Sequence, residues 1–267
     1  MKKISIVVFL FITACSTSKQ ISQQSSLLPQ NIAVAGKVFA SLYQQQSAEY
    51  KALCLQAFNI AHMRVDENLH ASSARPKAII TDIDETILDN SVYEVHQTLQ
   101  GKDYESISWY QWTDKSAADT VPGAAAFLKY AASKGIEIYY ITNREERERI
   151  STLLNLQKFN LPNADNVHLI PRQSTSSKEL RRQQVSATHE IILLLGDNLA
   201  DFSATFDKKS VDDRSQNVNS FASEFGNRFI VIPNPVYGDW ESALYKYNYT
   251  FTPAQKDSVI KSMIKGY

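Results

Sequence analysis

The chain has 267 residues, of which 43% are hydrophobic and 10% aromatic, and it carries 28 basic and 28 acidic side chains. This length and composition allow one substantial hydrophobic core and exclude a disordered or collagen-like chain. The formal net charge is zero, so composition gives no sign of the basic surface that binding to nucleic-acid polymers requires.

The N-terminal residues 1–14 are typical of a secretory signal peptide. Lys2 and Lys3 form a positive segment, and the apolar run from Ile4 to Ile12 is too short to span a lipid bilayer. The run leads into Cys15 in a pattern that resembles the lipobox of bacterial lipoproteins, whose cysteine is acylated. We therefore expect an exported protein, anchored to the cell membrane through lipid on Cys15, in the bacterial outer membrane because the next residue is not Asp. The alternative is an ordinary cleaved signal peptide.

The next two segments differ in amino-acid composition and in hydrophobic periodicity. Residues 15–32 are rich in Ser and Gln and predict a flexible tether, after which residues 33–267 form the folded domain. Between positions 35 and 69, apolar residues recur at helical spacing and predict one or two helices. Cys54 lies in this pattern and is interpreted as a core residue rather than a reactive thiol.

The remainder of the chain predicts an α/β fold. Short apolar, β-branched runs alternate with helix-length segments, which indicates a central, mostly parallel sheet with right-handed crossovers. The runs are residues 78–83, 136–141, 167–170, 191–195 and 229–232. Residues 90–120 form an aromatic-rich insertion that we expect to be a small helical cap over the carboxyl ends of the strands, where ligands bind in such sheets.

Acidic residues follow the first strand directly. Asp82 and Asp84 stand two apart at the end of a buried strand, where like charges are costly without a cation or a shared proton. Carboxylate ligands without a competing His/Cys spacing favour Mg²⁺ over zinc. A turn with helix-capping acids would explain Glu85 or Asp89, but it explains Asp82 poorly.

Polar residues also follow two later strands. Thr142 and Asn143 come after the second run, where a hydroxyl and backbone N–H groups suit phosphate oxygens, although ordinary helix capping explains these two residues as well. Asp197 and Asp201 follow the fourth run and would share a helix face, or simply favour the helix dipole. Lys178 lies between these blocks; it could neutralise a phosphate or be a solvated surface residue.

The combination of these motifs resembles the haloacid dehalogenase (HAD) superfamily of phosphatases. The sequences ITDIDETILDN at positions 80–90 and ILLLGDNLAD at positions 192–201 are similar to the paired signatures of the bacterial class C acid phosphatases, often lipoproteins of the e(P4) type. The resemblance runs from about residue 35 to the end. It implies a Rossmann-like HAD core with a small helical cap.

The resemblance assigns catalytic roles to four residues. Asp82 would attack phosphorus and form an aspartyl-phosphate, while Asp84 would protonate the leaving oxygen and then activate water. Thr142 would hydrogen-bond the phosphoryl oxygens, and Lys178 would offset their charge.

The resemblance also implies a Mg²⁺ site. Its ligands would be the side chains of Asp82 and Asp197 and the backbone carbonyl of Asp84. Asp201 would orient the water on the metal or Lys178.

Substrate binding is expected to involve one amide and several rings. Asn143 would bind the phosphoryl group together with Thr142. A nucleobase or nicotinamide ring could stack on Tyr237, Trp112 or Tyr93, although for each ring a place in the core is the simpler interpretation.

These assignments predict a Mg²⁺-dependent acid phosphatase, in effect a 5′-nucleotidase, acting on small phosphomonoesters such as 5′-nucleotides and nicotinamide mononucleotide. Its partners would be those substrates and the membrane, with a homodimer expected from the family alone. The alternative is a non-catalytic surface lipoprotein that binds haem or a host component. The complete set of Asp82, Asp84, Lys178 and Asp197 argues against that alternative.

Overall fold

The structure is a computed structural model that describes residues 31–267. The expected signal peptide 1–14, the lipidation site Cys15 and all but the last two residues of the expected tether 15–32 lie outside the described residues. Within the described part of the chain, no helix is both long and apolar enough to cross a membrane.

A five-stranded parallel sheet forms the centre of the molecule, with strand order β5-β4-β1-β6-β7. Its strands are β1 (Lys77–Thr81), β4 (Glu137–Glu145), β5 (Leu169–Arg172), β6 (Glu190–Gly196) and β7 (Phe229–Val231). The five apolar runs in the sequence are these strands, so the predicted α/β fold is confirmed. The chain winds outward in both directions from β1, and the crevice for ligands in such sheets lies at that point, beyond the carboxyl ends of the strands.

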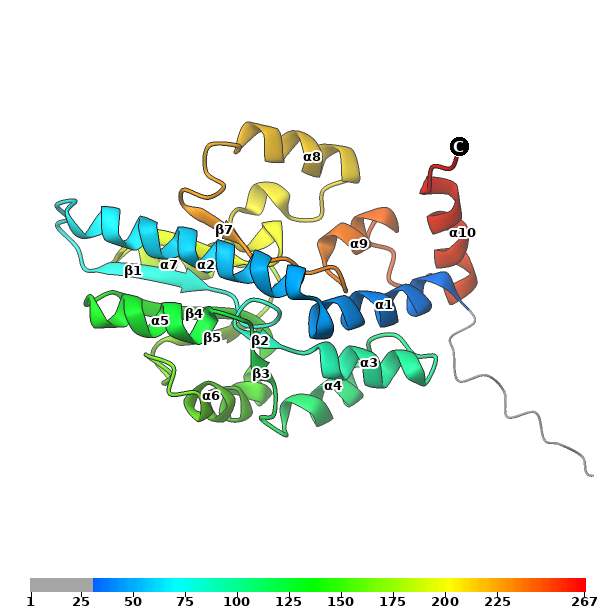
Figure 1. Cartoon of the computed structure of the whole chain (residues 1–267), viewed down its shortest axis with the longest axis horizontal. Coiled ribbons are helices and arrows are strands. Elements are labelled where there is room, and N and C mark those ends of the chain that lie inside the picture. The colour runs from blue at the N-terminus through cyan, green and yellow to red at the C-terminus, as the bar shows by residue number, and fades with distance from the viewer. Residues whose placement is uncertain (1–30) are drawn as a thin grey trace, which may run out of the picture.

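Both faces of the sheet are buried, which explains why its strands are continuous apolar runs. Ile79 of β1 packs into a core with α2 (Ala48–Leu69), α5 (Ala124–Ser133) and α6 (Arg149–Lys158). Ile80 faces the opposite way, into a second core with α7 (Glu179–Ser186) and Phe202. Figure 1 shows α2 and α5 side by side over the sheet, with α8 (Val211–Ser220) lying along another edge of the molecule.

The segment before the sheet forms two helices, α1 (Ile32–Gln46) and α2. They are separated at Ser47, which has extended backbone angles and whose hydroxyl accepts a hydrogen bond from the Tyr50 N–H at the start of α2. Cys54 of α2 is fully buried in the first core, as expected.

Residues 90–120 contain α3 (Ser91–Leu99) and α4 (Ser106–Thr113). A two-stranded antiparallel sheet of β2 (Leu88–Asp89) and β3 (Asp119–Thr120) joins them to the core. Helix α1 lies against α3, and α9 (Asp239–Leu244) and α10 (Pro253–Met263) lie close to α1 at the same end of the molecule (Figure 1). This is the end to which β1 points, so these helices surround the crevice.

Candidate active site

Three carboxylates and one ammonium group meet at the carboxyl ends of β1 and β6. Asp82 follows β1, Asp197 follows β6, and Asp201 ends a short 3₁₀ turn; oxygens of these three side chains lie within 4.8 Å of one another. Lys178, directly before α7, donates to Asp82 Oδ1, and its Nζ lies 2.6 Å from Asp201 Oδ1. The structure therefore brings together four residues that are far apart in the sequence. The first, Asp82, and the last, Asp201, are separated by 119 positions.

The charges in this centre are not balanced. Burial raises the pKa of Asp82 to about 7, against the opposing influence of Lys178. Burial, and then the negative charges of Asp201 and Asp82, raise the pKa of Asp197 well above its usual range. Burial alone would lower the pKa of the Lys178 ammonium, but Asp201 and Asp82 outweigh burial and raise it. One lysine among three acids, of which Asp82 and Asp201 are buried and Asp197 is half-buried, leaves negative charge that a cation would compensate.

The site requires a residue without a side chain at Gly196, the last residue of β6. A Cβ atom added there would lie 2.4 Å from both Cβ and Oδ2 of Asp201. Asp201 is held in that position because its Oδ2 accepts a hydrogen bond from the Asn198 backbone N–H, at 3.0 Å. The glycine before Asp197 therefore lets the Asp201 carboxylate approach the sheet.

Asp197 is positioned from two other loops. Its Oδ1 accepts a hydrogen bond from the Thr86 hydroxyl at 3.1 Å, and its Oδ2 accepts one from the Asn234 amide at 2.8 Å. Asn234 lies in the loop after β7 and also accepts the backbone N–H of Val236 at 2.9 Å. The loop after β7 is thereby part of the site, although sequence reasoning assigned no role to Asn234.

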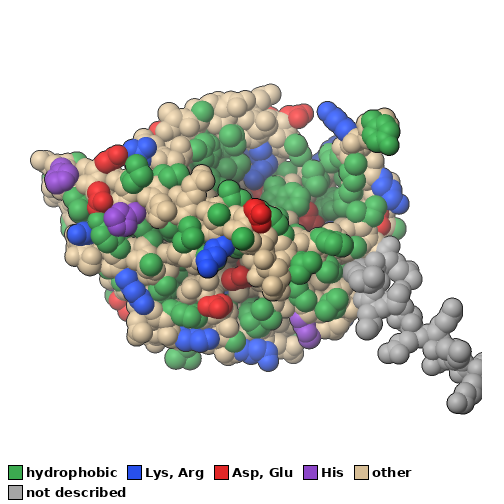
Figure 2. All heavy atoms as spheres, in the orientation of Figure 1, with side chains coloured by type: hydrophobic (Ala, Val, Ile, Leu, Met, Phe, Trp, Pro, Cys, Tyr) green, Lys and Arg blue, Asp and Glu red, His purple; other side chains and the backbone are tan. Residues whose placement is uncertain are grey.

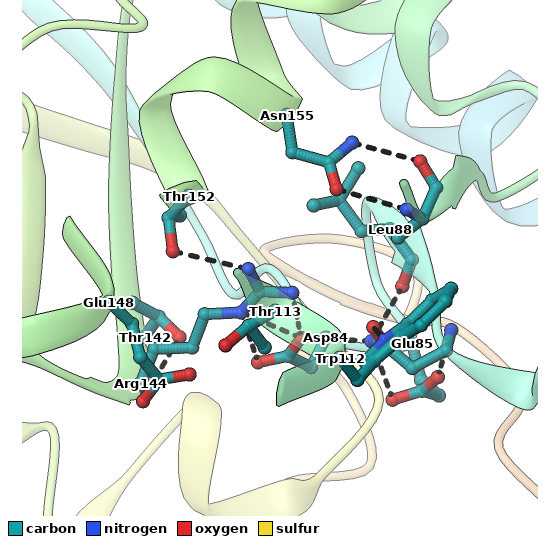
Figure 3. A network of polar contacts seen from close by, with 12 residues as sticks. Asp84, Glu85, Leu88, Trp112, Thr113, Thr142, Arg144, Glu148, Thr152 and Asn155 are labelled. Atoms are coloured by element: carbon teal, nitrogen blue, oxygen red, sulfur yellow. Dashed lines mark hydrogen bonds and ion pairs between the residues drawn. The ribbon is translucent and has the colours of Figure 1, made fainter. Parts of the chain in front are cut away.

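Asp84 is paired with a buried arginine, as Figure 3 shows. Arg144 Nη2 lies 2.8 Å from Asp84 Oδ1, and Arg144 Nε contacts both carboxylate oxygens. The guanidinium also donates to Thr152 and lies 5.7 Å from the Trp109 ring. Asn90 donates to Asp84 Oδ1 at 2.9 Å. Sequence reasoning missed Arg144; the available signal was its place directly after two residues with predicted phosphate-binding roles.

The two polar residues after β4 are held by the backbone and a second arginine. Thr142 is fully buried, and its hydroxyl accepts the backbone N–H of Arg144 at 3.0 Å. Arg181 of α7 donates to the Thr142 carbonyl and to Asn143 Oδ1, the latter at 2.9 Å. Asn143 lines the central cavity, whereas Thr142 lies outside that lining.

A cavity of about 560 Å³ opens above the carboxylate centre. Its lining includes Asp82, Asp84, Lys178, Asp197 and Asp201. The surface is hollowed between α8 and α10, with charged side chains visible inside the hollow (Figure 2). Aromatic rings from two distant parts of the chain also line the cavity, and they are Tyr104, Trp109, Tyr237, Tyr245, Tyr247 and Tyr249.

The structure separates the three rings that the sequence suggested for stacking. Tyr237 lines the cavity, and its hydroxyl donates to the buried carboxylate of Glu85. Tyr93 is buried, its hydroxyl shared with Ser108, and it lies outside the cavity lining. Trp112 also lies outside that lining. Its indole N–H donates to Asn90 Oδ1 at 2.8 Å. The expectation for these two rings is corrected: Tyr93 of α3 and Trp112 of α4 pack within the inserted segment and against the loop before it.

Comparison with known proteins agrees with this fold and site. The family model for the HAD superfamily, subfamily IIIB (acid phosphatase), matches residues 9–240. The class C acid phosphatase from Bacillus anthracis is 40% identical in sequence and superposes with a TM-score of 0.85, over 88% of this chain and 99% of that chain. The same figures hold for the structure of that enzyme with tungstate bound.

The chain therefore belongs to the HAD-superfamily acid phosphatases of subfamily IIIB. Within that family it is similar over most of its length to a class C acid phosphatase, and it is a phosphatase enzyme. This confirms the resemblance inferred from its motifs.

HAD phosphatases use a divalent metal, and the residues present here fit one. The donors are hard carboxylate oxygens that converge within 4.8 Å. Burial, and then the neighbouring acids, raise the pKa values of Asp82 and Asp197, so a cation would stabilise their charged forms. These two carboxylates and Asp201 are the side chains that would hold the ion.

Proposed function

We propose that this phosphatase hydrolyses phosphomonoesters with Mg²⁺ as its metal and with an aspartyl-phosphate on Asp82 as its intermediate. The observation that carries the proposal is the contact of Lys178 with both Asp82 and Asp201 at the base of the cavity. A lysine held there offsets the charge of a phosphoryl group that approaches three acids. Mg²⁺, when bound, would offset the charge of those acids and of the phosphoryl oxygens.

The proposed reaction has two steps. An Asp82 carboxylate oxygen attacks phosphorus, the bond from phosphorus to the ester oxygen breaks, and the Asp84 carboxyl gives its proton to the leaving alcohol. Asp84 then takes a proton from a water molecule, whose oxygen attacks phosphorus and releases phosphate from Asp82. The Asn143 side chain, which lines the cavity, and the Thr142 hydroxyl are proposed to bind phosphoryl oxygens.

The related class C acid phosphatase from Bacillus anthracis has tungstate bound, which supports an oxyanion as a ligand of this fold. Tungstate and phosphate are both tetrahedral oxyanions, and a site that admits one has the shape for the other. In the present chain, such an anion would face the Lys178 ammonium in the cavity.

We further propose that the substrates are 5′-nucleotides and nicotinamide mononucleotide. Rings of Tyr104 and Trp109 from the cap and of Tyr237, Tyr245 and Tyr249 from the C-terminal part line the same cavity as Asp82. Aromatic rings in the lining of a cavity suit a substrate with a flat heterocycle.

The test is phosphate release from p-nitrophenyl phosphate and a panel of nucleotides at pH 5 to 7, with Mg²⁺ or with EDTA. Asp82→Asn is expected to lower kcat by about a thousandfold or more, because it removes the nucleophile. Asp212→Asn, at an exposed position on α8, is the matched control and should retain activity. Acid quenching with ³²P-labelled substrate should leave label on the wild-type protein but none on Asp82→Asn. A folded, Mg²⁺-loaded enzyme with no turnover would contradict the proposal.

Export and lipid anchorage remain proposals that rest on the sequence around Cys15. Labelled palmitate fed to expressing bacteria should be incorporated into the wild type but not into Cys15→Ala. Incorporation into both would contradict lipidation at this cysteine. A homodimer is likewise a proposal, and sedimentation of the mature chain would test it.

A further inference from the structure

A second group of charged side chains lines the same cavity as the catalytic acids. We call it the distal cluster; its members are Lys37, Glu94, Asp103, Glu241 and Lys256. They come from α1, α3, the loop after α3, α9 and α10, so five separate segments converge there.

Four members of the distal cluster are paired with one another. Lys37 donates to Asp103 Oδ1 at 2.7 Å, and Lys256 donates to Asp103 Oδ2 at 2.6 Å. Lys37 Nζ also lies 3.5 Å from Glu241 Oε2. Lys37 and Lys256 therefore form their ion pairs with Asp103 and Glu241, and neither forms one with Glu94.

Glu94 is the exception. Only 4% of this residue is exposed, and among the described residues no donor makes a hydrogen bond to its carboxylate. Burial raises its pKa to about 7, with Lys37 opposing that shift and Asp103 and Glu241 adding to it. Its carboxylate oxygens are not completely enclosed, so a donor on a ligand in the cavity can reach them.

The hydroxyl of a tyrosine beside the distal cluster also lacks a hydrogen-bond partner. Tyr245 is 5% exposed, lines the cavity, and its buried hydroxyl has no hydrogen-bond partner among the described residues. Its ring lies 5.3 Å from the Lys256 ammonium. Two polar groups that are more than nine-tenths buried thus line one cavity with hydrogen-bonding capacity unused.

The cavity itself indicates which ligand would complete these groups. Lys178 and Glu94 line the same cavity, so the alcohol part of a phosphomonoester whose phosphoryl group lies at Lys178 would share that cavity with Glu94. Lys37 and Lys256 are both paired with Asp103 or Glu241, so the cluster offers an anion no unpaired cation. An N–H donor on the alcohol part would instead supply what the carboxylate lacks.

We propose that Glu94 is a specificity-determining residue that accepts a hydrogen bond from an N–H group at the far end of the leaving alcohol. The preferred substrates are then phosphomonoesters whose alcohol carries an amino- or amide-bearing ring, such as an aminopurine nucleoside. This inference rests on the proposed function, because it takes Asp82 as the place of phosphoryl transfer.

Selection between substrates would depend on whether the substrate donates a hydrogen bond to the Glu94 carboxyl group. An alcohol without a donor would occupy the cavity and leave the acceptor oxygens of Glu94 without a hydrogen bond from the substrate. Sites built to hydrogen-bond a substrate group reject analogues that lack the group more strongly than apolar pockets reject a missing methylene. The expected discrimination is about tenfold or more in kcat/KM.

Adenosine 5′-monophosphate and purine riboside 5′-monophosphate form the matched substrate pair, since they differ only in the exocyclic amine. The experiment measures kcat/KM of the full mature enzyme for both, and for p-nitrophenyl phosphate, in the wild type, Glu94→Gln and Glu94→Leu. Glu67→Gln, at an exposed position on α2, is the control.

The wild type and Glu67→Gln are expected to prefer the amine-bearing nucleotide about tenfold or more. Glu94→Leu should bring that ratio close to one, mainly through KM, and Glu94→Gln, which keeps an acceptor oxygen, should lie between. An equal ratio in the wild type and Glu94→Leu would overturn the inference while leaving the proposed function intact. If p-nitrophenyl phosphate is hydrolysed and neither nucleotide is, the nucleotide part of the proposed function is overturned too. Should Glu94→Leu fail to fold, Glu94→Gln decides by the same ratio.

Discussion

Arg144 contacts both carboxylate oxygens of Asp84 from a side chain that is itself almost completely buried. Nη2 to Oδ1 measures 2.8 Å and Nε to Oδ2 measures 3.3 Å. The pair joins the loop after β1 to the end of β4, and Thr152 of α6 holds the other side of the guanidinium. The orientation of Asp84 is thereby set by a residue 60 positions away.

Arg144→Lys should lower kcat more than it raises KM. A single ammonium cannot contact both oxygens of Asp84, so the proposed proton donor would lose its fixed orientation. We expect kcat to fall by roughly 10- to 100-fold, the scale of one misplaced proton-transfer group. The loss should be larger for an alkyl phosphate, whose leaving oxygen needs a proton, than for p-nitrophenyl phosphate. Arg147→Lys, at an exposed position, is the control, and equal losses with both substrates would argue against this role.

Gly196→Ala should impair both stability and activity. The added Cβ would lie 2.4 Å from Asp201 atoms, so Asp201 would have to leave its contact with Lys178. Overpacking of this kind costs about 1–3 kcal/mol, which a thermal melt would detect as a fall in Tm. Gly36→Ala is the matched control. Nothing lies within 4 Å of a Cβ at Gly36, which is inside α1, so that variant should gain about 0.5–1 kcal/mol. Similar melting temperatures for the two variants would contradict this account.

Adding Mg²⁺ to metal-stripped enzyme should raise Tm. The folded chain alone gathers the three acids, so the ion binds the folded state and stabilises it by about 2.7 kcal/mol at a hundredfold excess over Kd. Asp197→Asn should shrink the rise in Tm, whereas Asp212→Asn should retain it. The same Tm in Mg²⁺ and in EDTA would exclude this site as a Mg²⁺ site.

Glu94→Gln should stabilise the protein in a pH-dependent way. Burial raises the Glu94 pKa from 4.5 to about 7 in the folded state. Between these two values the folded chain keeps a proton that the unfolded chain has released, so wild-type stability falls as pH rises through this window. Below pH 4.5 the carboxyl is protonated in both states and there is no such loss. Glutamine has no proton to lose.

The stabilisation by Glu94→Gln is therefore expected to be small at pH 4.5 and complete above about pH 7. Its upper limit is about 3 kcal/mol, from 1.36 kcal/mol for each unit of pKa. Lys37, Asp103 and Glu241 face Glu94 and are present in both proteins, so their own titration largely cancels in the difference. Chemical denaturation of the two proteins from pH 4.5 to 8 checks this, with Glu67→Gln as the control. A difference that does not grow with pH would contradict the shift.

The strands and the acids after them could be predicted from sequence because both are local properties. Apolar runs buried on both faces mark the parallel strands, and Asp82 and Asp197 follow two of them directly. The carboxyl ends of adjacent parallel strands share one edge, so their convergence followed from the fold. The family signatures added the roles of these residues.

The partners of those residues could not be predicted in this way. Arg144 and Asn234 act through side chains whose direction depends on loop geometry, and neither stands out in its local sequence. The place of Tyr93 and Trp112 was mistaken for a related reason. Where an aromatic ring near a motif packs depends on the partner of its polar atom, which is Ser108 for Tyr93 and Asn90 for Trp112.

By itself, the sequence determined the α/β class, the strands and the acidic centre. Hydrophobic periodicity and the residues at strand ends can be recognised from short stretches of neighbouring residues. Only the tertiary structure decided that α1, α3, α9 and α10 bring the distal cluster into the cavity of Asp82. The reason is physical: whether Glu94 meets a donor depends on side chains between positions 37 and 256, which are 219 residues apart in the chain. Burial and pairing are properties of the packed chain.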